Sequence, residues 1–430
     1  MSVVTGDVAP ALDQAGPPRY LPLRKVAAIG VGNALEFYDF LTYTFFSIQI
    51  GHCFFPDQSA KDSLLLSLAT FGIGFIARPV GGFVIGRYGD RAGRKPAMML
   101  SFTLMGVGIT GLALTPSYAQ IGMAAPVLLV CFRLLQGFAL GGEVGPSTAY
   151  LIEAAPPNRR GLYVALQYAT QDVAVLAAGL IGFALSSLLD AEALDSWGWR
   201  LAFLIGVAVV PAGLAVRRTL PETLEAADVA TKEKVPVRVV WLGLALLMSG
   251  TIAAYIVDYM TTYAQDSLHM PASQAFGAAI VSGLALVIFE PIAGMLSDRF
   301  GRRPIALVAG VALLLVIMPG FWVVLHLGTP VALYGAVGLF STLLAFYTSP
   351  VLVALTESLP KSVRSGSLAV IYAVSIALFG GTAQFVVKFL TDRLDSPFVP
   401  GIYLCVALAI GLIALAQLEE SAPGVKGRHS

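Results

Sequence analysis

The sequence has little charge for its length. Charged side chains make up 12% of the 430 residues, whereas 57% of the residues are hydrophobic and the mean hydropathy is +0.79. Soluble domains carry about 25% charged residues, so this composition excludes an ordinary soluble protein and favours a membrane protein. The formal net charge of +1 gives no basis for binding nucleic acid, and we expect no such partner.

Cysteine and histidine are also scarce, which excludes several kinds of site. The three cysteines, Cys53, Cys131 and Cys405, have a spacing that suits neither a disulfide framework nor a metal site. None of the four histidines is paired with another at a ligand spacing. We therefore expect no metal site and no catalytic residues, because an integral membrane enzyme would need a concentrated set of His and Asp side chains.

The sequence has no Gly-x-x-x-x-Gly-Lys-Ser/Thr loop, which argues against a pump driven by nucleotide hydrolysis. We expect no cofactor.

Long apolar runs fill most of the chain. A spanning helix needs about 20 mainly apolar residues, and runs of that size predict an all-α integral membrane protein with twelve transmembrane helices in two six-helix halves. The runs do not alternate with period two, as the strands of a membrane barrel do. Twelve spans leave no room for the soluble domain of a membrane sensor. The predicted spans are 26–50, 62–86, 96–115, 121–150, 162–189, 199–217, 238–264, 274–296, 304–326, 331–356, 366–390 and 399–418.

The positions of lysine and arginine predict the orientation. Most of these 27 residues lie in the two tails and in the even-to-odd loops, so we expect that side to be cytoplasmic. The predicted domains are a cytoplasmic tail over residues 1–23, a six-helix half over 24–217, a cytoplasmic linker over 218–237, a second six-helix half over 238–418 and a cytoplasmic tail over 419–430. Residues 1–23 lack the apolar core of a signal peptide.

Three features recur at an offset of about 200 to 220 residues. The charged turn GRYGDRAGRK at 86–95 returns as GMLSDRFGRR at 294–303, and DFLTY at 39–43 returns as DYMTT at 258–262. Glu153 and Arg160 frame one loop as Glu357 and Arg364 frame another, with the same separation. Two repeats in the same order and orientation suit a transporter whose halves rock about a site at the membrane midplane.

The duplicated turn resembles the signature loop of the major facilitator superfamily, G-x-x-x-D-R-x-G-R-[RK]. The matching residues are Gly86, Asp90, Arg91, Gly93, Arg94 and Lys95, then Gly294, Asp298, Arg299, Gly301, Arg302 and Arg303. Almost the whole chain is similar to the metabolite–proton symporters of that superfamily. The similar segments include GNALEFYDF (32–40), FIARPVGG (75–82), RLLQGFALGGE (133–143), NRRG (158–161) and WGWRLAFLIG (197–206).

Within that family the citrate–proton symporters have the most similar segments. These are QYATQDVAVLAAGLIG (167–182), ALTESLPKSVRSGSLA (354–369) and FGG (379–381). The family usually has Trp where this chain has Phe37. The resemblance implies a monomeric, proton-driven transporter of the inner membrane.

The resemblance also implies that the charged turns gate the transporter. Their arginines follow the positive-inside rule and contact anionic headgroups. Their aspartates can accept hydrogen bonds from an arginine or from an exposed helix N-terminus, and their glycines allow a tight turn. Pure topological anchoring is the alternative interpretation. The expected gating residues are Gly86, Asp90, Arg91, Gly93, Arg94, Gly294, Asp298, Arg299, Gly301 and Arg302, with Glu153, Arg160, Glu357 and Arg364 as braces.

Ionisable side chains inside the spans are candidates for function, because they are costly at bilayer depth. Helical spacing puts polar side chains on one side of the first, fourth and fifth spans, as a water-filled cavity would require. We expect Arg78 and Arg133 to engage an anionic substrate. The other expected substrate residues are Asn33, Tyr43, Gln136, Gln167 and Gln171, and the expected proton-coupling residues are Glu36, Asp39 and Glu143.

These roles suggest a coupling hypothesis. A substrate carboxylate draws an arginine away from a protein carboxylate, which then binds a proton, so that the two cargoes favour one state together. In the alternative interpretation both arginines are structural partners of Asp39 and Glu143. A structural role, in helix packing or near a membrane surface, is also the alternative interpretation for Asp172, Asp258 and Glu290.

The function expected from these features is import of a small carboxylate with protons, with citrate or another tricarboxylate as the substrate. Betaine, proline, shikimate and 2-oxoglutarate stay open as substrates, and a drug–proton antiporter is the alternative mechanism. The expected partners are the organic acid, protons and the lipid bilayer.

Overall fold

The computed structural model describes residues 34, 37–56, 58–92, 94–141, 148, 151–153, 155–218, 235–360 and 363–422. Helices make up nearly all of this part of the chain, and it contains no strand. In chain order the elements are α2 (Ser47–Phe54), α3 (Ala60–Ala92), α4 (Arg94–Leu114), α5 (Tyr118–Ile121), α6 (Ala124–Leu140), η1 (Pro157–Arg159), α8 (Arg160–Leu188), α9 (Ala191–Ala193), η2 (Leu194–Gly198), α10 (Trp199–Arg218), α11 (Val237–Asp266), α12 (Ala272–Phe300), α13 (Arg302–Leu327), α14 (Pro330–Ser358), α15 (Arg364–Ser375), η3 (Ile376–Gly380), α16 (Gly381–Leu394) and α17 (Val399–Ala416).

The predicted all-α membrane fold is confirmed. Eight described segments are long and apolar enough to cross a bilayer, and two shorter apolar helices cover 99–114 and 124–140. The remaining predicted spans correspond to α10 and to the helical residues 37–45 followed by α2. Each of the twelve predicted spans therefore contains helical residues.

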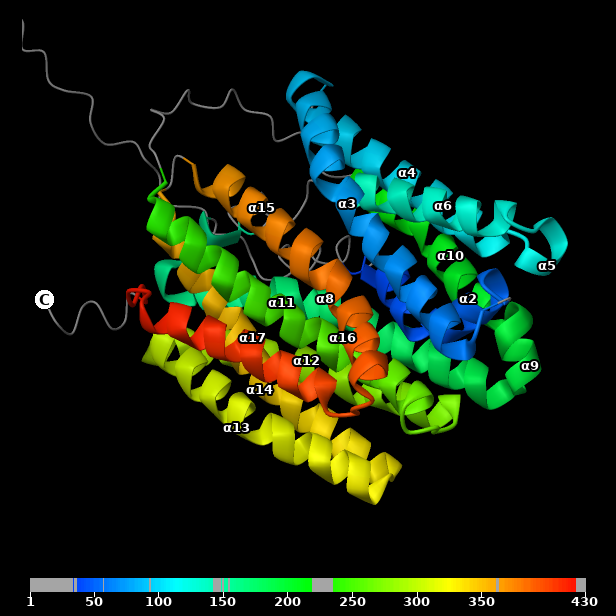
Figure 1. The fold of residues 1–430 in the computed structure, drawn as a ribbon. Coiled ribbons are helices and arrows are strands. Elements are labelled where there is room, and N and C mark those ends of the chain that lie inside the picture. Colours follow the sequence, from blue (N-terminus) through cyan, green and yellow to red (C-terminus); the bar gives the residue numbers. More distant parts are fainter. Residues whose placement is uncertain are drawn as a thin grey trace, which may run out of the picture.

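The helices form two groups that follow the order of the sequence. Figure 1 shows α3, α4, α6 and α10, coloured blue to green, on one side and the helices from α11 onward, coloured green to red, on the other, while α8 runs beside the second group, where it packs along α12. In the first group α3 packs against α6, and α4 packs against both α6 and α10. In the second group α13 packs against α14 and α17, and α11 packs against α14 and α17. We call these groups the first half and the second half.

The two halves meet chiefly where α8 packs along α12, and also where α3 crosses α16. Small residues allow both approaches. A Cβ atom at Gly283 of α12 would lie 2.5 Å from the backbone N of Leu176 on α8, and one at Gly72 of α3 would lie 2.7 Å from the carbonyl O of Gly381. The helix pairs thus pack backbone against backbone.

Two predicted spans differ from the observed helices. In the span predicted over 121–150 the long helix α6 begins only at Ala124. The residues before it form a separate turn, α5, which starts with a capping box of Ser117 and Gln120 and ends at Gly122, whose φ is 58°. The span predicted over 366–390 contains the π-helical segment η3, which ends where α16 meets α3. The extra residue of a π segment re-aims the following helix at that crossing.

The predicted domain boundaries fall largely outside the described residues. The N-terminal tail over 1–23, most of the linker over 218–237 and most of the tail over 419–430 lie there. These boundaries stay predictions.

The packing of α3 on α6 gives a first testable prediction. A Cβ atom at Gly137 would lie 1.7 Å from the carbonyl O of Gly74, so Gly137→Ala forces the two helices apart. We expect it to lower stability by about 1 to 3 kcal/mol, measured as a lower Tm of the purified protein in detergent. Gly335→Ala on α14 is the matched control, because that site is exposed and has no heavy atom within 4 Å. Equal Tm values for the two variants would contradict the described packing.

Candidate functional site

Arg133 and Asp39 form a buried ion pair inside the first half. Arg133 lies on α6 and Asp39 lies in the helical residues 37–45. Arg133 Nη1 is 3.6 Å from Asp39 Oδ2, and the two side chains are 2% and 1% exposed. Gln136 accepts a hydrogen bond from Arg133 Nη1 at 2.6 Å and donates one through Nε2 to Asp39 Oδ1 at 3.4 Å. Three residues that the sequence singled out therefore form one cluster.

Aromatic rings separate both predicted arginines from the interior space between the halves. The Cζ atoms of Arg133 and Arg78 lie 5.7 Å and 5.1 Å from the centroid of the Phe40 ring. Arg78 Cζ also lies 4.2 Å from the centroid of Phe75. Phe40 and Phe75 in turn contact the ring of Tyr255 on α11, at centroid distances of 5.8 and 6.0 Å. Cation–π contacts of this kind stabilise guanidinium groups where water is scarce.

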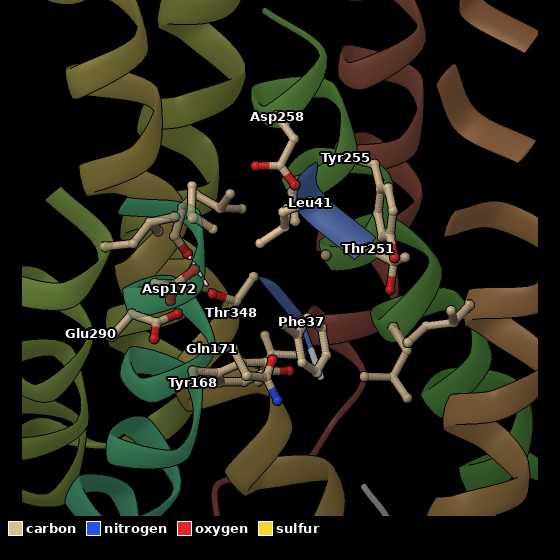
Figure 2. Close-up of a pocket in the computed structure, with 18 of the residues that line it drawn as sticks. Phe37, Leu41, Tyr168, Gln171, Asp172, Thr251, Tyr255, Asp258, Glu290 and Thr348 are labelled. Atoms are coloured by element: carbon tan, nitrogen blue, oxygen red, sulfur yellow. Dashed lines mark hydrogen bonds between the residues drawn. The ribbon is translucent and has the colours of Figure 1, made fainter. Parts of the chain in front are cut away.

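A central pocket lies between the halves, on the other side of this aromatic wall. Residues of α8, α11, α12, α14 and α15 line it together with Phe37, Phe40 and Leu41 (Figure 2). No lysine, arginine or histidine lines the pocket within the part of the chain that the structure describes. The polar and acidic lining residues are Tyr168, Gln171, Asp172, Thr251, Tyr255, Asp258, Glu290, Thr348 and Tyr372.

Three carboxyl groups from three helices reach this pocket. Asp172 of α8 and Glu290 of α12 line it from the two halves, and along the contact of these helices they lie between the approach of Gly294 to Ala165 and that of Gly283 to Leu176. Asp258 of α11 points toward the cavity in Figure 2. Glu290 is 3% exposed. Such a set can hold protons or can bind a cationic group.

The other predicted substrate residues are spread over the first half. Gln171 lines the pocket, whereas the side chain of Gln167 accepts a hydrogen bond from Thr148 Oγ1 at 3.0 Å. The hydroxyl of Tyr43 donates to the carbonyl O of Ser67 at 3.2 Å, and its ring centroid lies 4.3 Å from Arg133 Cζ. Asn33, Glu36 and Glu143 lie outside the described residues.

Asp172, Asp258 and Glu290 were not among the predicted substrate or proton residues. The available signal was their charge inside apolar runs, and for Asp258 also the repeat that pairs it with Asp39. The signal was incomplete because contact between Asp172 and Glu290 depends on how α8 docks on α12.

At the charged turns, the second copy joins the two halves. Asp298, near the end of α12, accepts hydrogen bonds from the backbone N–H groups of Gly161 (2.9 Å) and Leu162 (3.1 Å) in the first turn of α8. Arg302 Nη1 lies 2.7 Å from Asp298 Oδ1. A carboxylate at a helix N-terminus is stabilised by the free N–H groups and by the helix dipole. This residue therefore caps a helix of the other half.

The predicted braces lie beside this cap. Glu357 lies 3.5 Å from Arg160 Nη1 and 3.5 Å from Arg302 Nε, and it also accepts a hydrogen bond from the hydroxyl of Ser421. Arg364 Nη1 lies 3.8 Å from Glu153 Oε1. Both ion pairs with the first half, Arg160–Glu357 and Glu153–Arg364, cross the boundary between the halves.

The first copy of the charged turn differs from the second in how closely other helices approach its first glycine. No heavy atom comes within 4 Å of a Cβ built on Gly86, whereas a Cβ on Gly294 would lie 2.6 Å from the carbonyl O of Gly161. Arg91 is exposed. In the second copy Arg299 is exposed and lies over the ring of Phe300, and Gly301 has a φ of 107° that favours glycine. Gly93 and the side chains of Asp90 and Arg94 lie outside what the structure describes.

The halves also touch at the end of the bundle away from the charged turns. The hydroxyls of Ser47 and Thr262 lie 3.3 Å apart, and Thr262 Oγ1 donates to the carbonyl O of Thr44 at 3.2 Å. The rings of Phe46 and Phe276 lie 5.0 Å apart. The first span and α11 thus meet at that end.

Comparisons with known proteins agree with this architecture. A model of the Major Facilitator Superfamily matches residues 40–377. The citrate-proton symporter of Salmonella typhi is 35% identical over 403 residues, which cover 90% of this chain and 92% of that protein. The proline/betaine transporter of Escherichia coli (strain K12) is 29% identical over 423 residues, covering 93% and 84%. The crystal structure of a D-xylose-proton symporter matches with a TM-score of 0.77 at 19% identity, over 94% of this chain and 98% of that one, which shows the fold.

The Arg133–Asp39 pair gives a second prediction. Asp39→Asn leaves a buried guanidinium that cannot lose its proton, so we expect a loss of about 3 to 5 kcal/mol of stability. Arg133→Gln leaves a carboxyl that can neutralise itself by taking up a proton, so its cost is smaller and decreases as the pH is lowered. Thermal unfolding in detergent at several pH values measures both. The opposite ranking, or equal costs at every pH, would show that the pair does not act as a buried ion pair.

Proposed function

The chain belongs to the major facilitator superfamily, and from that membership we propose that it is a secondary transporter that imports a small organic anion together with protons. Citrate or another tricarboxylate is the proposed substrate. The protein is a multi-pass membrane protein, and we place it in the inner membrane as a monomer with both termini on the cytoplasmic side. The proton gradient supplies the driving force, and no cofactor takes part.

The observation that carries the proposal is the buried Arg133–Asp39 pair beside the pocket. Phe40 follows Asp39 in the chain, lines the pocket and covers both Arg133 and Arg78. An anion in the pocket attracts these guanidinium groups. Arg133 can move toward the anion only by weakening its contact with Asp39. Asp39 then binds a proton, because a buried carboxylate without its partner is costly. Substrate and proton thereby favour the same state.

The relatives support the same class of substrate. The citrate-proton symporter of Salmonella typhi matches nearly the full length of this chain at 35% identity. We assign a tricarboxylate on this likeness together with the two arginines.

The charged turns fit an alternating-access cycle. Asp298 and Glu357 bind groups of the first half, namely the N-terminus of α8 and Arg160. These contacts are polar and join the two halves at one end of the bundle, so they can form in one state and break in another. Gating by the residues of both turns belongs to this proposal.

The lining of the pocket favours a second candidate, a zwitterion such as betaine or proline. Five aromatic residues line the pocket beside the three carboxyls. Aromatic faces with nearby carboxylates bind quaternary ammonium groups, and a proline/betaine transporter is among the relatives. The lining residues concerned are Phe37, Phe40, Tyr168, Tyr255 and Tyr372, with Asp172, Asp258 and Glu290.

The third prediction tests the proposed function. We expect purified protein in proteoliposomes to accumulate labelled citrate when an inward proton gradient is imposed at fixed sodium, and to lose this accumulation when a proton ionophore is added. Unlabelled betaine, proline, 2-oxoglutarate and shikimate, each in excess, serve as competitors, and protein-free liposomes are the control.

The outcomes separate the candidates. Uptake of labelled betaine with no uptake of citrate would replace the first candidate with the second. Substrate efflux driven by an inward proton gradient would indicate an antiporter. Equal uptake with and without the gradient would remove proton coupling from the proposal.

A further inference from the structure

The carboxyl groups of Asp172 and Glu290 lie within the contact between the halves. Asp172 belongs to α8 and lines the pocket, and Glu290 belongs to α12 and is 3% exposed (Figure 2). Along the contact between α8 and α12 both residues lie between the approach of Gly294 to Ala165 and that of Gly283 to Leu176, so they are about one helical turn apart. The Oε2 atom of Glu290 is buried without a hydrogen-bond partner, and Glu290 lines the same pocket. One acceptor of the pair is therefore unsatisfied and adjoins the pocket.

No cation neutralises this pair in the described part of the chain. None of the ion pairs found there includes Asp172 or Glu290. The titratable groups that face the two carboxyls are Tyr168 of α8, Asp258 of α11 and Tyr372 of α15, and α14 contributes only Leu344, Thr348 and Val351 to the lining. All of these neighbours are neutral or acidic.

Two ionised carboxylates cannot hydrogen-bond to each other, because both are acceptors only. At a separation of about 4 Å their repulsion is about 4 kcal/mol even with an effective dielectric constant of 20. A single proton removes the repulsion and turns one carboxyl into a donor, as in other pairs of carboxyls that share a site. One shared proton would therefore stabilise the contact between α8 and α12 at this position.

We propose that Asp172 and Glu290 form a proton-binding site between the halves, and that its proton holds α8 against α12. The ligand is the proton itself. It enters from the pocket that both residues line, and it leaves to the pocket when the pair deprotonates. The two anions then repel each other across the helix contact, which favours separation of the halves.

This site rests on the proposed proton coupling but is separate from the Arg133–Asp39 pair. That pair lies wholly within the first half, whereas Asp172 and Glu290 belong to different halves. Only the second pair makes the distance between the halves depend directly on protonation.

The fourth prediction concerns Glu290→Gln in proteoliposomes. The amide of Gln can donate to Asp172, so the helix contact is kept without a proton. We expect accumulation of labelled citrate driven by the proton gradient to fall at least about fivefold, the lower end of ordinary coupling free energies. Exchange of internal for external citrate needs no net proton movement, so we expect it to fall less than the accumulation driven by the gradient. Asp62→Asn, at an exposed site on α3, is the control, and we expect it to change neither the accumulation nor the exchange of citrate.

A second measurement does not depend on transport. Infrared difference spectra of the purified wild type over a pH titration should contain the carbonyl band of a buried protonated carboxyl. Glu290→Gln should remove that band, Asp172→Asn should shift it, and Asp62→Asn should leave it unchanged.

The two measurements distinguish failure of this site from failure of the proposed function. If the wild type is driven by the gradient and Glu290→Gln accumulates citrate equally well, the site is wrong and the function stands. If the wild type accumulates no citrate under the gradient, the function as stated fails, and the infrared band alone decides the site. A spectrum of Glu290→Gln that matches that of the wild type overturns the proposal.

Discussion

A charge in the hydrocarbon layer has to be paired or neutralised, because its solvation by water is lost there. The interior of this protein meets that requirement in two ways. Arg133 keeps its charge under all ordinary conditions, so it lies against Asp39, Gln136 and the faces of aromatic rings. Asp172 and Glu290 have no cation beside them in the described part of the chain, and a shared proton would remove the repulsion between them. In the proposed function Asp39 takes up a proton only when Arg133 moves away, whereas the pair between the halves responds to pH directly.

The acid pair depends in turn on the packing of α8 against α12. Glycines on both helices bring the backbones close: a Cβ atom at Gly179 would lie 3.0 Å from Ala279 Cβ, and one at Gly294 would lie 2.6 Å from the carbonyl O of Gly161. Asp172 lies between Gly161 and Gly179 in sequence, and Glu290 lies just before Gly294. Larger residues at these glycines would separate the helices and break the carboxyl contact. Packing and protonation therefore stabilise the same arrangement.

Much of the fold could be predicted from the sequence, because long apolar runs and a duplicated charged turn are signals that adjacent residues carry. The cluster of Asp39, Arg133 and Gln136 could also be predicted, because a charged side chain inside a span needs a partner and the spans contain few possible partners. The pairing of Asp172 with Glu290 was not. These residues are far apart in the chain, and helical spacing alone does not group Asp172 with Gln167 and Gln171, although Gln171 and Asp172 both line the pocket. Only the docking of one half on the other brings them together.

The tail after α17 illustrates the same limit. Glu420 accepts hydrogen bonds from the backbone N–H groups of Arg302 and Arg303, both at 2.9 Å, and so caps the start of α13. In sequence it is one acid in a polar tail, with no pattern that marks it as a helix cap. Its partner is a free helix N-terminus far earlier in the chain, which attracts whichever carboxylate the fold brings near it.

The unequal settings of the two charged turns bear on how the halves can move. Contacts join α8 to α12 along their length, and Asp298 and Glu357 add polar contacts at the charged end. On the other side of the bundle α3 meets the second half near Gly72 and Gly381, while Gly86, beyond that crossing, has open space around it. The halves can therefore move relative to each other in two ways, about the crossing of α3 with α16 or by separation of α8 from α12. The second movement has to break the carboxyl pair as well, so the protonation of Asp172 and Glu290 affects that movement far more than the first.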